Sequence, residues 1–122
     1  SGSTLTFLGL SFKPNTDDIR ESSSIKIAFN LSEKGYKINC YDPKAMANAK
    51  KEYDKFNYFD SAHEACKNSD AIIIGTEWNE FRALNFPEIS KIVKNKKIFD
   101  LRNIYNASEL ERIGFEYYGT GK

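Results

Sequence analysis

Short apolar runs alternate with amphipathic stretches along the whole sequence, and this alternation restricts the fold more than any other feature. Residues 4–10 and 71–75 are almost continuously apolar or β-branched, which is typical of strands buried on both faces. Short links join these runs to stretches with helical spacing, an order that predicts parallel strands and right-handed crossovers. We therefore expect an α/β fold, a Rossmann-like three-layer sandwich with a mostly parallel sheet of about six strands.

The turn and capping residues set approximate limits for these elements. Ser22 or Ser23 is suited to cap a helix that runs to about Lys34, and Gly35 supplies a left-handed stop. In that helix Ile27 is expected on the buried face. The expected strands are 4–10, 37–41, 58–60, 71–75, 97–101 and 115–118, and the other expected helices are 45–53, 61–68, 87–94 and 107–113.

Size and composition narrow the function classes. The 122 residues suit one domain, with a formal net charge of +1 that gives no basis for binding nucleic acid or an anionic membrane. No apolar run approaches the roughly 20 residues of a membrane span, and no signal peptide is visible. Residues 1–3 resemble a cloning remnant, so residues 4–122 are expected to be the domain. Cys40 and Cys66 form no CxxC pair, which suits a reducing cytoplasm and two buried hydrophobes.

Three loops at one edge of the expected sheet carry the charged side chains that could bind a ligand. Open α/β sheets bind ligands beyond the carboxyl ends of their strands. The loops after the first, fourth and fifth expected strands lie at that edge, and they contain Lys13 and Arg20, Thr76-Glu77-Trp78, and Arg102. Several cations at one edge of a nearly neutral protein indicate a diphosphate or a similar anion. The alternative is that each cation pairs with a local acid such as Asp17, Asp18 or Glu21.

The sequence lacks the marks of a catalytic centre or a dinucleotide cradle. A dinucleotide-binding first turn reads GxGxxG, whereas Gly9 stands alone before Leu10-Ser11-Phe12. The single histidine, His63, lies in a polar helix and is expected at the surface. No Cys/His spacing indicates zinc and no nucleophile has an adjacent base, so we expect no metal site and no catalytic residue. The pattern predicts a binding domain.

Two further features have competing interpretations. Trp78 could stack on a base, or it could be a packing anchor that orders its loop. Asp17 and Asp18 could form a metal pair, although in a turn before a helix such residues more often bond backbone N–H groups or fix a neighbour such as Arg20.

Several segments resemble, in order, the C-terminal domain of the UDP-glucose/GDP-mannose dehydrogenase family. The resemblance runs from about Leu8 to the end of the chain and departs from the family at Lys122, where arginine is more frequent, and at Ser22-Ser23-Ser24, where a proline often follows the first serine. The matching segments are Gly9–Ser22, Tyr41-Asp42-Pro43, Asp70–Ile74, Thr76–Phe81, Asp100–Asn103 and Gly119-Thr120-Gly121.

This resemblance implies a cytoplasmic NAD-dependent enzyme with an N-terminal NAD-binding domain, a linking helix and this nucleotide-sugar-binding domain. Such enzymes oxidise the sugar C6 alcohol to a carboxylate in two steps and form homodimers. Their catalytic cysteine lies in the N-terminal part, so neither Cys40 nor Cys66 should inherit its role. Carried over by motif, Phe12, Lys13 and Arg102 would bind the UDP-sugar substrate, and Arg20 would reach toward NAD.

The sequence leaves two questions: which nucleotide sugar is the substrate, and whether the chain is part of an enzyme. The segments Pro14–Asp18 and Tyr41–Pro43, with Ala45-Met46, resemble the UDP-glucose-oxidising members best. Members that oxidise GDP-mannose or UDP-N-acetylmannosamine share the skeleton but differ in the first loop. A stand-alone, non-catalytic nucleotide-binding domain is the competing interpretation from another class.

Overall fold

The computed structural model describes residues 2–120. Ser1, which is part of the expected cloning remnant, and Gly121 and Lys122, which are part of the family comparison, lie outside the described residues. All six strands are parallel and form one sheet in the order β3-β2-β1-β4-β5-β6, which confirms the predicted Rossmann-like sheet. The strands are β1 (Thr4–Leu8), β2 (Lys37–Tyr41), β3 (Asn57–Tyr58), β4 (Ala71–Ile74), β5 (Lys97–Asp100) and β6 (Glu116–Gly119).

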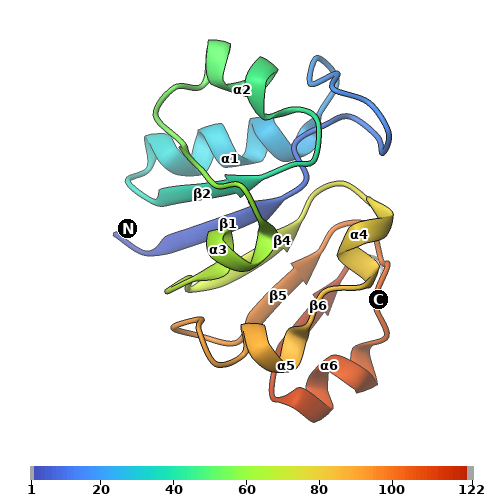
Figure 1. Cartoon of the computed structure of the whole chain (residues 1–122). Helices are drawn as coiled ribbons and strands as arrows, with labels where there is room; N and C mark the ends of the chain where they lie inside the picture. The colour runs from blue at the N-terminus through green and yellow to red at the C-terminus, as the bar shows by residue number, and fades with distance from the viewer. Residues whose placement is uncertain (1, 121–122) are drawn as a thin grey trace.

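Helices cover both faces of this sheet, which gives the three layers expected from the alternation. Figure 1 shows α1 and α2 at the top of the view and α4, α5 and α6 on the opposite side of the sheet. The helices are α1 (Ser23–Glu33), α2 (Met46–Glu52), α3 (Ala62–Cys66), α4 (Asn79–Arg82), α5 (Phe86–Ile89) and α6 (Ala107–Ile113).

Each face of the sheet has its own apolar core. One core joins α1 and α2 to the sheet through residues such as Ile25, Ala49 and Phe7. The other joins α3, α4, α5 and α6 to the opposite face through residues such as Phe81 and Ile98. Alternate residues of the strands serve the two cores, because successive side chains of a strand point to opposite faces.

Most of the predicted boundaries are close to those of the structure, but the prediction of one helix was wrong. Strand 37–41 and helix 107–113 match the structure, Ser22 accepts a hydrogen bond from Ile25 N, and Gly35 has φ 97°. The expected helix 87–94 ends at Ile89, and α4 was not predicted. The backbone after α5 turns toward another loop instead, since the amides of Lys94 and Asn95 both donate to Ser69 O.

One part of the sheet lacks a helix above it. Ile27, expected to be buried, is 40% exposed, and Phe99 and Tyr118 on β5 and β6 are also exposed. Ile27 and Phe99 border an apolar groove of about 320 Å³ that also includes Leu31 and Ile73, and Tyr118 stacks on Phe99. The prediction for Ile27 was wrong because this side chain lies on the flank of α1 that faces the groove beside Phe99 and Leu101. None of the helices within residues 2–120 is long and apolar enough to cross a membrane.

Candidate functional site

The loops after β1, β4 and β5 meet at the point where the strand order changes direction. The strands β1 and β4 are neighbours in the sheet, but their connections leave in opposite directions along it. Open parallel sheets bind ligands in the crevice beyond such a switch point. The three loops singled out in the sequence therefore lie together at this edge of the sheet, where a ligand crevice is expected.

Small residues let the first two loops approach each other closely. A Cβ built on Gly9, whose φ is 98°, would lie 2.5 Å from Thr76 N, and one on Gly75 would overlap the Ser24 side chain. The Ser24 hydroxyl donates to Gly9 O at 2.8 Å and the Thr76 hydroxyl donates to Ser11 O at 2.8 Å. The start of α1 and the ends of β1 and β4 thus form one tightly packed unit.

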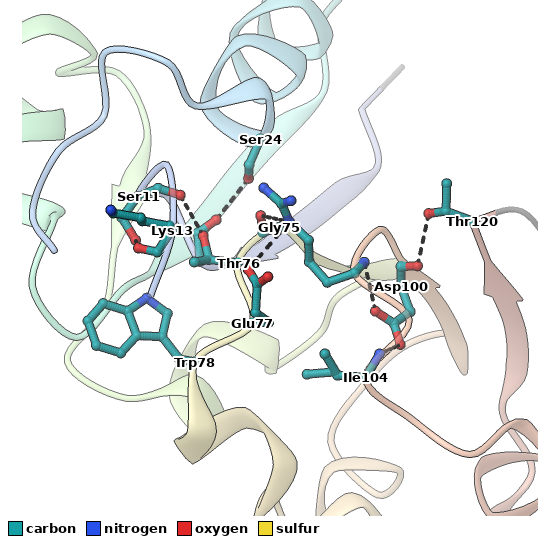
Figure 2. Close-up of polar contacts among 12 residues, drawn as sticks. Ser11, Lys13, Ser24, Gly75, Thr76, Glu77, Trp78, Asp100, Ile104 and Thr120 are labelled. Atoms are coloured by element: carbon teal, nitrogen blue, oxygen red, sulfur yellow. Dashed lines mark hydrogen bonds and ion pairs between the residues drawn. The ribbon is translucent and has the colours of Figure 1, made fainter. Parts of the chain in front are cut away.

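Phe12 and Lys13 follow directly in the loop after β1. The Ser11 hydroxyl donates to Lys13 O at 2.9 Å, which ties the lysine backbone to the packed unit. Both side chains are exposed, and within residues 2–120 the Lys13 ammonium takes part in no ion pair. Figure 2 shows Ser11 and Lys13 on one side of Thr76 and Asp100 on the other.

Arg102 approaches the same unit from β5. Its Nε donates to Gly75 O at 3.1 Å and lies 3.7 Å from Glu77 Oε1. The side chain is 30% exposed. Because Nε already has partners, the two terminal nitrogens of the guanidinium group remain to bind an anion.

Asp100 holds the loop that carries Arg102. Its buried carboxylate accepts hydrogen bonds from Arg102 N, Ile104 N, Tyr105 N and Tyr117 Oη. A buried carboxylate needs such donors, because an unpaired buried charge is costly. Arg102 therefore follows a turn whose backbone is fixed.

Arg20 pairs with a nearby acid, which was the alternative to ligand binding in the sequence analysis. Its side chain is 85% exposed and bonds Asp18 through two contacts, Nε to Oδ1 at 3.1 Å and Nη2 to Oδ2 at 3.0 Å. These bonds lower the pKa of Asp18 to about 2. Asp18 also accepts from Arg20 N, as expected for a residue that fixes its neighbour rather than a metal.

Asp42, which the sequence showed only as part of a motif, organises the loops. Its side chain is buried, and it accepts five hydrogen bonds from Leu10 N, Ser11 N, Lys44 N, Ala45 N and Trp78 Nε1. Trp78 is likewise buried, so its indole is a packing anchor and not an exposed stacking surface. Local patterns could not reveal this cluster, since Leu10 and Trp78 lie 32 and 36 residues from Asp42.

The two cysteines and the histidine, the other side chains with catalytic potential, are buried or lie outside the three loops. Cys40 and Cys66 are both free and buried, as predicted, and burial raises the pKa of the Cys66 thiol to about 12. His63 is exposed on α3, also as predicted. Neither thiol is available as a nucleophile in the folded chain.

Comparison with known proteins gives this crevice a context. Residues 6–107 match the model of the UDP-glucose/GDP-mannose dehydrogenase family, UDP binding domain. The chain belongs to the UDP-glucose/GDP-mannose dehydrogenase family. The matched range includes the loops after β1, β4 and β5.

Individual relatives agree with this membership. The chain is 47% identical to UDP-glucose 6-dehydrogenase of Rickettsia bellii, over 98% of the chain and 28% of that protein. Its fold matches the structure of a UDP-glucose dehydrogenase from Pyrobaculum islandicum with a TM-score of 0.80 and 30% identity, over 97% of the chain and 25% of that structure.

A second solved structure is that of a dehydrogenase named for another sugar. This NDP-N-acetyl-D-galactosaminuronic acid dehydrogenase from Methanosarcina mazei gives a TM-score of 0.83 at 27% identity, over 99% of the chain and 25% of that structure. The chain thus spans about a quarter of the length of the family members that it matches.

Proposed function

We propose that residues 4–122 are the UDP-sugar-binding domain of an NAD-dependent UDP-glucose 6-dehydrogenase, which oxidises UDP-glucose to UDP-glucuronate in two steps. The observation that carries the proposal is the pair of cations at the crevice. The Lys13 ammonium is in no ion pair within the described residues, and the Arg102 Nε is held by Gly75 O and Glu77 Oε1, which leaves the terminal nitrogens for the ligand. A nucleotide sugar presents a diphosphate that such a pair of cations can bind.

Each proposed contact has a distinct task. Lys13 and Arg102 bind and orient the diphosphate, and the exposed ring of Phe12 packs against the base or the sugar. Both cations approach the unit formed by Gly9, Ser24 and Thr76, which gives the site a rigid floor. The sugar C6 atom then points away from this floor toward the catalytic cysteine, which the proposal assigns to the rest of the protein.

The described residues do not fit NAD as a ligand of this sheet. A Cβ at Gly9 would already contact Thr76, so the first turn has no room for a pyrophosphate to approach the backbone. Asp42, at the end of β2, is buried and saturated by protein donors, so it cannot bind a ribose. We assign NAD to an N-terminal domain of a homodimeric protein, with Arg20 reaching toward it from the exposed loop.

Steady-state kinetics of the full-length protein test the substrate contacts. We expect Lys13→Ala and Arg102→Ala each to raise the UDP-glucose KM by about 10-fold or more, since a charge-assisted hydrogen bond contributes about 1.5–3 kcal/mol. The matched controls are Lys26→Ala, an exposed lysine on α1, and Arg112→Ala on α6. Unchanged kinetics in both site variants, with normal melting, would remove these residues from the site.

The substrate assignment has its own test. We expect the full-length wild-type protein to reduce NAD with UDP-glucose and not with GDP-mannose or UDP-N-acetylmannosamine. The likeness to a dehydrogenase of another amino sugar makes the last comparison necessary. Turnover of a different nucleotide sugar would keep the diphosphate site and reject UDP-glucose, whereas no turnover with any of them would reject the enzymatic proposal.

A further inference from the structure

The Asp42 carboxylate bonds three loops at once. Oδ2 accepts from Leu10 N at 2.7 Å, Ser11 N at 3.0 Å and Trp78 Nε1 at 3.2 Å, and Oδ1 accepts from Lys44 N at 2.9 Å and Ala45 N at 2.8 Å. These donors belong to the loops after β1, β2 and β4. The carboxylate is 1% exposed and its oxygens are fully used, so it cannot itself contact a ligand.

Its partners lie immediately beside the residues of the proposed site. Ser11 precedes Phe12 and Lys13 in the chain. Trp78 follows Glu77, whose carboxylate lies 3.7 Å from Arg102 Nε, and the same loop contains Gly75, whose carbonyl accepts from Arg102. Asp42 therefore joins the loop that carries Lys13 to the loop that holds Arg102, beside the direct bond from the Thr76 hydroxyl to Ser11 O.

We propose that Asp42 is a positioning residue for the nucleotide-sugar site, which holds the Lys13 loop and the Arg102 partners in register before the ligand binds. The inference rests on the proposed function. Both loops consist of irregular backbone that would otherwise lose conformational freedom on binding, and a preformed site avoids that loss. The donors to Asp42 are backbone amides and an indole, with no cation among them, so the carboxylate fixes geometry without neutralising either site cation.

Asp42→Asn in the full-length protein tests the proposal. The amide keeps the size but places an N–H₂ group among N–H donors, so one set of loop contacts is lost. We expect the UDP-glucose KM to rise about 10-fold, which corresponds to about 1.4 kcal/mol of binding free energy. The kcat at saturation should fall less than about 3-fold, because the direct ligand contacts are intact once the loops are ordered.

Trp78→Phe is the milder companion variant. It removes one donor to Asp42 and keeps an aromatic ring in the buried position. We expect a smaller rise in KM, about 2- to 4-fold, which is the size of a single neutral hydrogen bond. This variant decides the question if Asp42→Asn does not fold, and an unchanged KM would then overturn the proposal.

Asp70→Asn is the matched control at the other edge of the sheet. The Asp70 carboxylate also joins separate segments, accepting from Thr4 N at 2.8 Å and Asn95 Nδ2 at 2.9 Å, but it lies at the amino end of β4. We expect a lower melting temperature with an unchanged KM. A rise in KM equal to that of Asp42→Asn would show that general loss of stability, and not loop positioning, causes the effect.

A double-variant cycle separates positioning from bulk structure. If Asp42 acts through the Lys13 loop, Asp42→Asn should raise KM clearly less in a Lys13→Ala background than in the wild type. Full additivity would overturn the proposal. A wild-type protein that shows no turnover with any nucleotide sugar would instead reject the proposed function, so the two failures are distinguishable.

Discussion

Arg20 and Asp18 form an exposed ion pair whose pH behaviour can be predicted. Hydrogen bonds from Arg20 lower the pKa of Asp18 to about 2. A lowered pKa in the folded state means that the pair stabilises the fold above the ordinary carboxyl range, and the contribution is lost as the pH falls toward about 2. Carbon-13 titration of the Asp18 carboxyl should show this midpoint, and Arg20→Ala should return it toward the ordinary aspartate value. A low midpoint in both proteins would contradict the assigned cause.

The same arginine has a separate kinetic prediction. Arg20 lies on the exposed part of the loop after β1, where its side chain and its backbone amide both bond Asp18. If it contacts the cofactor in the full-length protein, Arg20→Ala should raise the NAD KM more than the UDP-glucose KM. Steady-state kinetics with each substrate varied in turn would measure this, and the opposite order would reject the NAD contact.

The two cysteines should be inert in the folded chain. Burial raises the pKa of both thiols, to about 12 for Cys66, so neither forms a thiolate near neutral pH. We expect no labelling of the native chain by a thiol-specific alkylating reagent, and labelling of both residues in denaturant, as read by mass spectrometry. Rapid labelling of native Cys66 would show that α3 opens readily.

Residue-level prediction from sequence was best where partners are local. Ser22 as a cap, Gly35 as a left-handed stop and Asp18 as the partner of Arg20 all depend on neighbours within a few positions. Asp42 could not be identified in this way, because only the folded sheet brings Leu10 and Trp78 to its carboxylate.

Among the structural elements, the contact between the start of α1 and the end of β4 should be the least tolerant of added volume. A Cβ on Gly75 would overlap the Ser24 side chain and lie 2.7 Å from Gly9 O. We expect Gly75→Ala to lower the free energy of unfolding by about 1–3 kcal/mol or more, the usual cost of overpacking. Chemical denaturation would measure the change.

Gly114 provides the control for this prediction. It ends α6 with φ 113°, and a Cβ there would meet only the Lys96 side chain, at 3.5 Å. Gly114→Ala should therefore carry only the backbone cost of a left-handed residue, about 1–2 kcal/mol. A larger loss at Gly114 than at Gly75 would mean that the loops after β1 and β4 can move apart.

Periodicity predicted the elements whose ends carry clear signals. Strand 37–41 and helix 107–113, which ends at Gly114, matched the structure. The expected helix 87–94 failed because Ser69 captures the amides of Lys94 and Asn95, a contact more than 20 residues away in the chain. α4 is one short turn and has no apolar stripe long enough to detect.

For the whole molecule, the uneven cover of the sheet predicts a gradient of protection. The central strands β1 and β4 contribute to both cores, whereas Phe99 of β5 and Tyr118 of β6 are exposed on a part of the sheet that no helix within residues 2–120 covers. Hydrogen exchange of the 122-residue chain should therefore be slowest in β1 and β4 and fastest in β6 and in the two-residue β3. Equal protection of β6 and β1 would show that something covers this face in solution.

The saturated carboxylate of Asp42 also limits how this scaffold could be redesigned. Adding glycines to the loop after β1 would imitate the sequence of a dinucleotide-binding turn, yet the acid at the end of β2 would still face inward, bound to five donors. Freeing it would detach the loops that carry Lys13 and Trp78. A protein engineer who wanted a dinucleotide site here would have to rebuild three connections together, so a library that varies the first loop alone should yield no NAD binders.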